Sequence, residues 1–422
     1  MASLQEAVVK GLAADRGLFM PMTIKPLPQD FYDTIDALSF QEIAYRVADA
    51  FFGEDIPADT LKQIVYDTLS FDVPLVKVAD NIYSLELFHG PTLAFKDVGG
   101  RFMARLLGYF IKKEGQKDVN VLVATSGDTG SAVANGFLGV EGIHVYVLYP
   151  KGKVSEIQEK QFTTLGQNIT ALEVDGTFDD CQALVKAAFM DKELNEHLSL
   201  TSANSINVAR FLPQAFYYFY AYAQLKRAGK ADNAVICVPS GNFGNITAGL
   251  FGKKMGLPVK RFIAANNRND IFYQYLQTGK YNPRPSVATI ANAMDVGDPS
   301  NFARVLDLYG GSHADISAEI SGTTYTDEQI RETVKETWKK HHYLLDPHGA
   351  CGYRALQEGL KQGETGVFLE TAHPAKFLET VESIIGEAVE IPAKLQEFMK
   401  GEKKSLQMTK EFADFKKYLL SI

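Results

Sequence analysis

Cysteine is scarce in this chain. Cys181, Cys237 and Cys351 lie far apart, and no CxxC pair occurs. An odd number of widely spaced cysteines does not suit a disulfide scaffold or a structural zinc site. We therefore expect neither a disulfide framework nor a bound metal, and a reducing, cytoplasmic compartment fits the cysteine content best.

An excess of basic charge is also lacking. Lys and Arg number 43 against 51 Asp and Glu, which gives a formal net charge of −8. Nucleic acids and anionic membranes attract clustered positive charge, so we expect neither as a partner. The N-terminus has no basic segment followed by an apolar one, and no run has the length and apolar character of a membrane span. A soluble cytoplasmic protein is predicted.

Short apolar runs alternate with amphipathic segments along most of the 422 residues. This alternation is typical of an α/β fold with open, mostly parallel sheets covered by helices. The strands expected from apolar runs are 119–125, 143–148, 169–174, 234–238 and 366–370, and the segments 131–137 and 155–167 between them are expected to be helices. We predict a small, mostly helical N-terminal domain at 1–82, a smaller α/β part at 83–220, a larger α/β part at 221–390, and covering helices at 391–422.

Three of these strands end in a polar loop that opens a helix: residues 126–130, 239–245 and 371–374. Ligands of open α/β sheets collect at the carboxyl ends of strands, where backbone N–H groups at helix starts bind anions. The loops contain neither GxxxxGK[ST] nor GxGxxG, which argues against nucleoside-triphosphate and dinucleotide sites. Ordinary capped turns are the alternative interpretation.

Lys96 lies between a His-Gly-Pro turn and a segment with apolar residues at helical spacing, 98–110. In the first turn of a buried helix, the helix dipole and desolvation both disfavour an ammonium, so a lowered lysine pKa is predicted. Such a lysine serves as an amine nucleophile and base, although a solvated lysine is the alternative. One such lysine with two anion-binding loops suggests pyridoxal phosphate, which needs a lysine, a phosphate cradle and a partner for its ring nitrogen.

Four segments, 89–97, 124–130, 239–245 and 371–377, together resemble the threonine synthases, and residues 17–21 resemble the N-terminal signature of that family. The family belongs to the tryptophan-synthase-β-like group of pyridoxal phosphate enzymes, fold type II. The segments occur in the same order over roughly residues 5–385, so chance agreement is a poor explanation. The resemblance implies two α/β domains that flank the cofactor.

The resemblance also implies roles for particular residues. Lys96 would bind the cofactor covalently and then move protons at the substrate. The cofactor phosphate would be bound by Gly241, Asn242, Phe243, Gly244 and Asn245, and the ring nitrogen would face Thr371. The substrate would be bound by Thr92, by Ser126, Asp128 and Thr129 at its carboxylate, and by Asn204, Ser205, Asn207 and Arg210 at its phosphate. Lys153 or Arg101 could share the phosphate.

The implied reaction converts O-phospho-L-homoserine and water to L-threonine and phosphate, the last step of threonine biosynthesis, by a carbon–oxygen lyase that acts as a monomer or homodimer. Two alternatives remain open. A phospho-lyase with the same motifs would release a keto acid and ammonia, and a non-catalytic relative would only bind a phosphorylated metabolite. The sequence assigns no role to His89, His348 or His373, and the Asn-, Pro- and Gly-rich residues 266–299 are either a loop near a ligand or a long connection.

Overall fold

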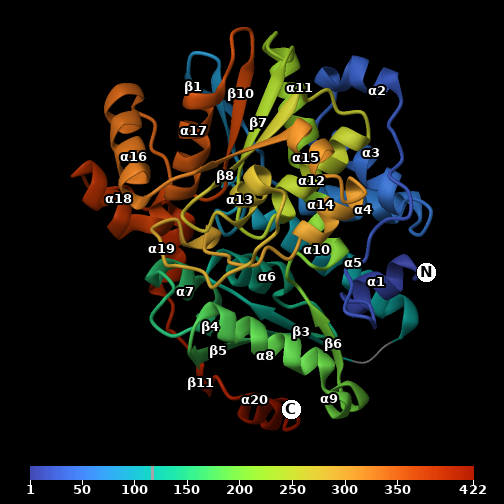
Figure 1. The fold of residues 1–422 in the computed structure, drawn as a ribbon. Helices are drawn as coiled ribbons and strands as arrows, with labels where there is room; N and C mark the ends of the chain where they lie inside the picture. The colour runs from blue at the N-terminus through green and yellow to red at the C-terminus, as the bar shows by residue number, and fades with distance from the viewer. Residues whose placement is uncertain (116–117) are drawn as a thin grey trace. The chain divides into compact units, whose positions relative to one another are not determined.

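The computed structural model describes residues 1–115 and 118–422 of the chain. They form two compact units, each built around one β-sheet (Figure 1). Unit 1 comprises Met1–Phe19, Lys96–Arg210 and Ile391–Ile422, and unit 2 comprises Met20–Phe95 and Phe211–Glu390. The chain passes from unit 2 to unit 1 between Phe95 and Lys96.

Unit 1 contains a five-stranded parallel sheet with the order β11-β5-β4-β3-β6. The strands are β3 (Val119–Ala124), β4 (Ile143–Pro150), β5 (Ile169–Asp175), β6 (Ser199–Ser202) and β11 (Leu406–Thr409). The helices are α1 (Leu4–Lys10), α5 (Lys96–Glu114), α6 (Asp128–Phe137), α7 (Glu156–Thr163), α8 (Phe178–Met190), α9 (Lys192–His197), α10 (Val208–Phe211), α19 (Ala393–Lys400) and α20 (Phe412–Leu419).

Alternate side chains of a strand point to opposite faces of its sheet. Because consecutive residues of these strands are apolar and buried, both faces of the unit 1 sheet are apolar. Leu122, Leu148 and Leu172 pack in one cluster with residues of α8 and α20. Val147 belongs to the other face, where it lies close to Gly130 of α6. Figure 1 shows α8 on one side of this sheet and α6 on the other. The sheet is therefore buried between two helical layers.

Unit 2 contains a six-stranded sheet with the order β1-β2-β10-β7-β8-β9, in which only the β1–β2 pair is antiparallel. The strands are β1 (Leu75–Ala79), β2 (Ile82–Glu86), β7 (Ala234–Pro239), β8 (Arg261–Asn266), β9 (Ile320–Thr324) and β10 (Thr365–Glu370). The helices are α2 (Gln29–Thr34), α3 (Phe40–Phe52), α4 (Ala58–Thr68), α11 (Ala215–Arg227), α12 (Gly244–Lys254), α13 (Ile271–Thr278), α14 (Phe302–Leu308), α15 (His313–Glu319), α16 (Asp327–His341), α17 (Pro347–Gly359) and α18 (Leu378–Ile385), with short 3₁₀ turns η1 (Ile35–Ala37), η2 (Leu212–Gln214), η3 (Asn292–Met294) and η4 (Pro374–Phe377).

The core of unit 2 lies between its sheet and the helices α16 and α17. Val235, Ile263 and Phe368 of the sheet pack with residues of these helices, among them Val334 and Leu356. On the aromatic helix α11, the Tyr218 ring lies 6.1 Å from the Phe262 ring of β8. Polar side chains anchor the long segment between α13 and α14. Asn267 Nδ2 donates to the Ala291 carbonyl and to Asp295, so this segment is bound to its own unit.

The predicted α/β architecture is confirmed, and each of the five predicted strands is present within two residues of its expected ends. Two local expectations differ from the structure. The helix expected over 155–167 ends at Thr163, and Gly166 and Gln167 adopt positive φ, which a helix does not allow. The C-terminal segment contains helices as expected, but it also contributes strand β11, which pairs with β5.

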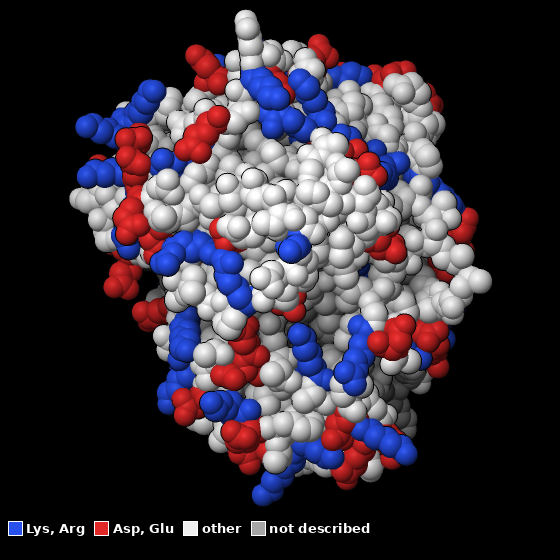
Figure 2. All heavy atoms as spheres, viewed as in Figure 1, with Lys and Arg blue, Asp and Glu red and all other residues white. Residues whose placement is uncertain are grey.

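Charged side chains of both signs are interspersed on the face shown in Figure 2. Within the part of the chain that the structure describes, no helix is long and apolar enough to cross a membrane.

Candidate active site

Lys96 is the first residue of α5, as predicted, and its side chain is half-buried. Lys96 Nζ donates a hydrogen bond to Thr129 Oγ1 at 2.6 Å. This contact requires a close crossing of α5 and α6, because a Cβ at Gly100 would lie 2.8 Å from the Ala132 carbonyl oxygen. The glycine therefore brings the lysine to the start of the next helix.

The loop after β3 provides a polar helix start beside Lys96. Gly127 has φ of 144°, and a Cβ there would lie 2.5 Å from the Gln158 side chain. Thr125 Oγ1 accepts from the Gly127 and Gly130 N–H groups, and Gln158 Nε2 donates to Asp128 Oδ1 at 3.0 Å. Asp128 is already the first residue of α6, three residues earlier than the sequence predicts. These hydrogen bonds hold the loop in one conformation, in which the side chains of Ser126 and Thr129 are half-buried.

Residues predicted to bind the substrate phosphate mainly contact the backbone of unit 1. Asn204 Nδ2 donates to the Ala124 carbonyl at 3.0 Å. Asn207 is fully buried, and its Nδ2 donates to the Val8 carbonyl at 2.9 Å. Arg210 is 1% exposed, and it donates to the carbonyls of Ala203 and of Lys96 at 2.8 and 3.1 Å. These contacts hold the segment behind Lys96 in place. Ser205 is half-buried in the turn before α10.

In unit 2, the loop predicted to bind the cofactor phosphate connects β7 with α12. Phe243 has φ of 66°, a costly conformation for a bulky residue, and its ring packs against Phe272 at 4.6 Å. Asn242 Oδ1 accepts from the Ser300 N–H at 2.7 Å. A Cβ at Gly241 would lie 2.8 Å from the Ala293 carbonyl oxygen, so only glycine fits here. The loop is held in one shape by its neighbours.

Gly244 and Asn245 lie in the first turn of α12, where the backbone N–H groups of a helix have no partner within it. Tyr218 Oη lies 2.7 Å from Asn245 Oδ1 and donates to it, which directs the amide nitrogen Nδ2 away from Tyr218. Among the described residues, Asn245 Nδ2 is buried and meets no hydrogen-bond acceptor. A buried donor without an acceptor is costly, and an anion at this helix start would satisfy it.

Thr371 follows β10 directly, and residues 93–95 run beside it. The Phe95 N–H donates to the Thr371 carbonyl at 2.8 Å, and the His373 N–H donates to the Leu93 carbonyl at 3.0 Å. Thr92 is fully buried, and its carbonyl accepts from Lys376 Nζ at 2.8 Å. The chain leading into Lys96 is therefore fixed to the residues around Thr371 within unit 2.

No role was predicted for a cluster of titratable side chains behind Thr371. Glu370 and Asp346 are fully buried, and His348 is 2% exposed. Asp346 is the N-cap of α17, so the Asp-Pro-His-Gly segment could have been recognised from sequence as a helix start. His373 is a near neighbour, and burial, reinforced by His89, lowers its pKa to about 4.

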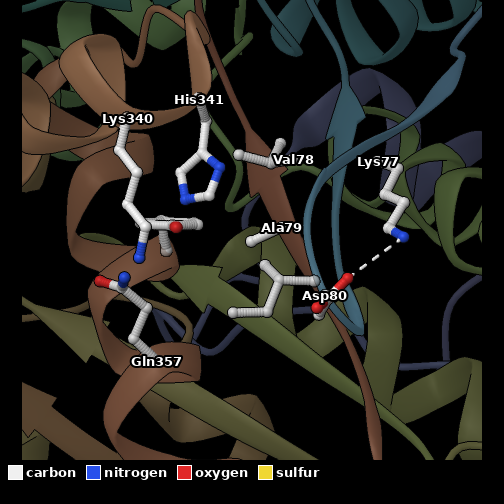
Figure 3. Close-up of a pocket in the computed structure, with 9 residues that line it drawn as sticks. Lys77, Val78, Ala79, Asp80, Lys340, His341 and Gln357 are labelled. Atoms are coloured by element: carbon white, nitrogen blue, oxygen red, sulfur yellow. Dashed lines mark ion pairs between the residues drawn. The ribbon is translucent and has the colours of Figure 1, made fainter.

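A pocket of about 530 Å³ lies elsewhere in unit 2, where the β1–β2 hairpin meets α16 and α17 (Figure 3). In the close-up, His341 points toward the hairpin strand, whereas Lys77 points away and pairs with Asp80 at 3.4 Å. None of the predicted site residues lines this pocket. Over residues 1–115 and 118–422, no group of three or more His, Cys, Asp or Glu side chains could hold a metal ion.

The hydrogen-bond donors of this site fit the predicted cofactor. The loop at 241–245 lies at a helix N-terminus and holds the unpaired amide of Asn245, which suits a phosphate. Lys96 at a helix start suits the covalent attachment. In agreement, the chain matches the family model described as pyridoxal-phosphate dependent enzyme over residues 73–371. The fold and site thus define a pyridoxal-phosphate-dependent enzyme.

Two further family models are more specific. The model for the threonine synthase N terminus matches residues 1–69, and the model for the threonine synthase C-terminal part matches residues 349–419. The chain is 46% identical to threonine synthase from Haemophilus influenzae, over 99% of this chain and 96% of that protein. This chain belongs to the threonine synthase family.

Solved structures agree with this assignment. The crystal structure of threonine synthase from Escherichia coli superimposes with a TM-score of 0.94 at 45% identity, covering 100% of this chain and 97% of that one. The structure of pyridoxal-phosphate-bound threonine synthase from Brucella melitensis has a TM-score of 0.91 at 35% identity, covering 99% and 96%. The predicted family, fold class and cofactor are confirmed.

Proposed function

We propose that this enzyme converts O-phospho-L-homoserine and water to L-threonine and inorganic phosphate, in the cytoplasm, as a monomer or homodimer. Membership of the threonine synthase family supports the reaction, and the phosphate-binding chemistry around α12 supports the cofactor. The four predicted domains, 1–82, 83–220, 221–390 and 391–422, remain part of the proposal.

The observation that carries the cofactor assignment is the unpaired amide of Asn245. Its Nδ2 and the first N–H groups of α12 are donors that need an anion, and a phosphate accepts several hydrogen bonds at once. In this proposal Gly241, Asn242, Phe243, Gly244 and Asn245 bind the cofactor phosphate, and Thr371 faces the ring nitrogen. A hydroxyl at Thr371 carries no charge, so it would leave that nitrogen largely unprotonated.

When bound, pyridoxal phosphate supplies an electron sink that stabilises carbanions next to the substrate amine. Lys96 would hold the cofactor covalently in the resting enzyme, and its Nζ would act as a proton carrier once the substrate amine has taken its place. Thr129 Oγ1, which accepts the hydrogen bond from Lys96 Nζ, orients the amine for these proton transfers. A single base would then remove the α and β protons and return protons to Cγ and Cα, while phosphate leaves from Cγ and water adds at Cβ.

For the substrate we propose that Ser126, Asp128 and Thr129 bind the carboxylate at the start of α6, with Thr92 as a further contact. Asn204, Ser205, Asn207 and Arg210 remain the proposed contacts of the leaving phosphate. Asn207 and Arg210 also donate to backbone carbonyls, so we expect these two residues to contribute to stability as well as to substrate binding. Asn207→Ala should lower stability first, whereas Ser205→Ala should raise the KM for the phosphorylated substrate first.

An end-point assay with O-phospho-L-homoserine, scoring threonine, keto acid and phosphate, tests the function. The proposal expects threonine and phosphate in equal amounts from wild-type enzyme, and no product from Lys96→Ala. Lys112→Ala, at the exposed end of the same helix, is the matched control and should remain active.

Other outcomes would favour the alternatives. Phosphate together with a keto acid would identify a phospho-lyase. A protein that shows no cofactor absorption and releases nothing, even after added pyridoxal phosphate, would contradict catalysis and favour a binding protein.

A further inference from the structure

A chain of buried side chains connects the end of β10 with the segment behind the proposed phosphate loop. The Asp346 N–H donates to Glu370 Oε1 at 2.7 Å, and Glu370 directly precedes Thr371. Asp346 Oδ2 lies 2.5 Å from His348 Nδ1. The Ala293 N–H of η3 donates to His348 Nε2 at 3.1 Å. All of these residues belong to unit 2.

The hydrogen bonds define the protonation state of His348. A backbone N–H can only donate, so His348 Nε2 must accept and carry no proton. The ring proton therefore lies on Nδ1 and is donated to Asp346 Oδ2. His348 is thus neutral, and its two nitrogens have different partners that cannot be exchanged.

Asp346 is the anionic member of this series of hydrogen-bonded side chains. Its Oδ1 accepts from the Gly349 N–H at 2.7 Å, its Oδ2 accepts from His348, and the helix start of α17 adds a favourable dipole. Glu370, in contrast, is held protonated: burial, reinforced by the adjacent Asp346, raises its pKa well above the ordinary value. A hydrogen bond with the Asp346 side chain also favours the protonated form of Glu370 and so raises its pKa.

The surrounding groups agree with one buried anion rather than two. Glu86 is paired in register with Glu370 on the neighbouring strand, and it accepts from Tyr343 Oη at 3.0 Å and contacts His89 Nε2 at 2.7 Å. Glu86 therefore has partners of its own. The nearby His373 is neutral because burial lowers its pKa to about 4.

At both of its ends, the series of side chains from Glu370 to His348 contacts residues that have a role in the proposed function. At one end, Glu370 is the last residue of β10, and the Asp346 N–H holds its side chain directly before Thr371. At the other end, His348 holds η3, and Gly241 is packed so closely on η3 that an added Cβ would lie 2.8 Å from the Ala293 carbonyl oxygen and 3.0 Å from Met294 Cα. At Gly349, an added Cβ would overlap the Glu370 carboxyl group, so Asp346, Gly349 and Glu370 are closely packed.

We propose that His348, Asp346 and Glu370 form a positioning network that sets the ring-nitrogen partner Thr371 and the phosphate loop in register for the cofactor. His348 is the positioning residue that transmits this order to the phosphate loop through Ala293. The proposal rests on the proposed roles of Thr371 and Gly241–Asn245, and it adds that charge is needed at Asp346 but not at Glu370.

Isosteric variants of the holoenzyme separate these roles. Glu370→Gln keeps an acceptor for the Asp346 N–H and replaces a group that is already neutral, so cofactor dissociation should stay within about twofold of wild type. Asp346→Asn puts an amide where an anion accepts several donors, and dissociation should accelerate about tenfold or more.

Two variants of His348 test the link to η3. His348→Gln can place an acceptor near the former Nε2, whereas His348→Asn can only replace the Nδ1–H donor. The network predicts wild-type-like cofactor binding for His348→Gln and weaker binding for His348→Asn. The ³¹P NMR signal of the bound cofactor phosphate provides a readout independent of turnover. It should shift or broaden in His348→Asn and Asp346→Asn, and match wild type in Glu370→Gln and His348→Gln.

Folded His348→Asn and Asp346→Asn proteins with wild-type ³¹P signals and dissociation rates would overturn the network, as would loss of cofactor in Glu370→Gln. If Asp346→Asn does not fold, the two His348 variants decide, because they leave the helix cap in place. Failure of the proposed function is distinguishable: a wild type that binds the cofactor but forms no threonine would contradict the reaction, while the ³¹P comparison would still test the network.

Discussion

The hydroxyl of Tyr218 provides a direct test of how the phosphate loop is oriented. Tyr218 is fully buried, and its Oη lies 2.7 Å from Asn245 Oδ1 and 2.8 Å from the Asn245 carbonyl oxygen. In the structure the amide oxygen, not Nδ2, lies next to the phenol, so the hydroxyl donates to oxygen acceptors and Nδ2 has no partner among the described residues. Tyr218→Phe removes this contact with almost no change in shape.

The expected effects are a loss of stability and a loss of cofactor affinity. A missing hydrogen bond that leaves a buried acceptor unpaired costs about 1–3 kcal/mol of unfolding free energy. Without the hydroxyl, the Asn245 amide can turn and present its oxygen to the phosphate. Loss of one hydrogen bond to a charged group, worth about 1.5–3 kcal/mol, raises the cofactor dissociation constant about 10- to 100-fold.

Tyr353→Phe is the matched control. Tyr353 is 1% exposed, but among the described residues its hydroxyl has no hydrogen-bond partner, so the same substitution should change stability by less than about 0.5 kcal/mol. Urea unfolding of both variants and equilibrium titration with pyridoxal phosphate are the assays. Equal stability losses in the two variants, or wild-type cofactor affinity in Tyr218→Phe, would refute this account of Asn245.

Two further predictions concern the same unit. Gly241→Ala would place a Cβ 2.8 Å from the Ala293 carbonyl oxygen, so we expect about 1–3 kcal/mol of destabilisation and weaker cofactor binding, measured by unfolding and titration. Gly108→Ala in α5, where the nearest heavy atom would be 3.5 Å away, should be neutral or stabilising, and equal losses in both variants would contradict the packing argument. His373 has a pKa lowered to about 4, chiefly by burial, so the folded state binds fewer protons than the unfolded one, and stability should fall by up to about 3 kcal/mol as pH decreases from 6.5 to 4. Urea unfolding across this range should show a shallower pH dependence for His373→Asn than for wild type, and parallel curves would rule out His373 as the source.

Local sequence determined which segments become strands and helices, although the start of α6 and the end of α7 differ by three and four residues from the expected ones. Apolar runs such as 119–125 identify buried parallel strands because both faces of such a strand are covered. Lys96 was recognisable as a helix-start lysine because the apolar spacing after it has the helical period. The loop at 239–245 could be proposed as a phosphate site because glycines and asparagines between a strand and a helix suit anion binding.

Tertiary structure alone decided which of these polar residues have partners. Arg210 and Asn207, which remain proposed substrate contacts, donate in the fold to the carbonyls of Lys96 and Val8, and sequence spacing does not encode such pairings. Asn245 became the unpaired donor only because Tyr218, 27 residues earlier, contacts its amide oxygen.

The sequence by itself therefore determined the family, the cofactor class and the position of Lys96 at a helix start, because these depend on short motifs and local periodicity. The charge state of the Glu370–Asp346–His348 network was decided only by the tertiary structure. Both carboxyl groups are fully buried, and the hydrogen bonds from Gly349 and His348 make Asp346 the anion while Glu370 stays neutral. These contacts exist only once the strands and helices have packed together.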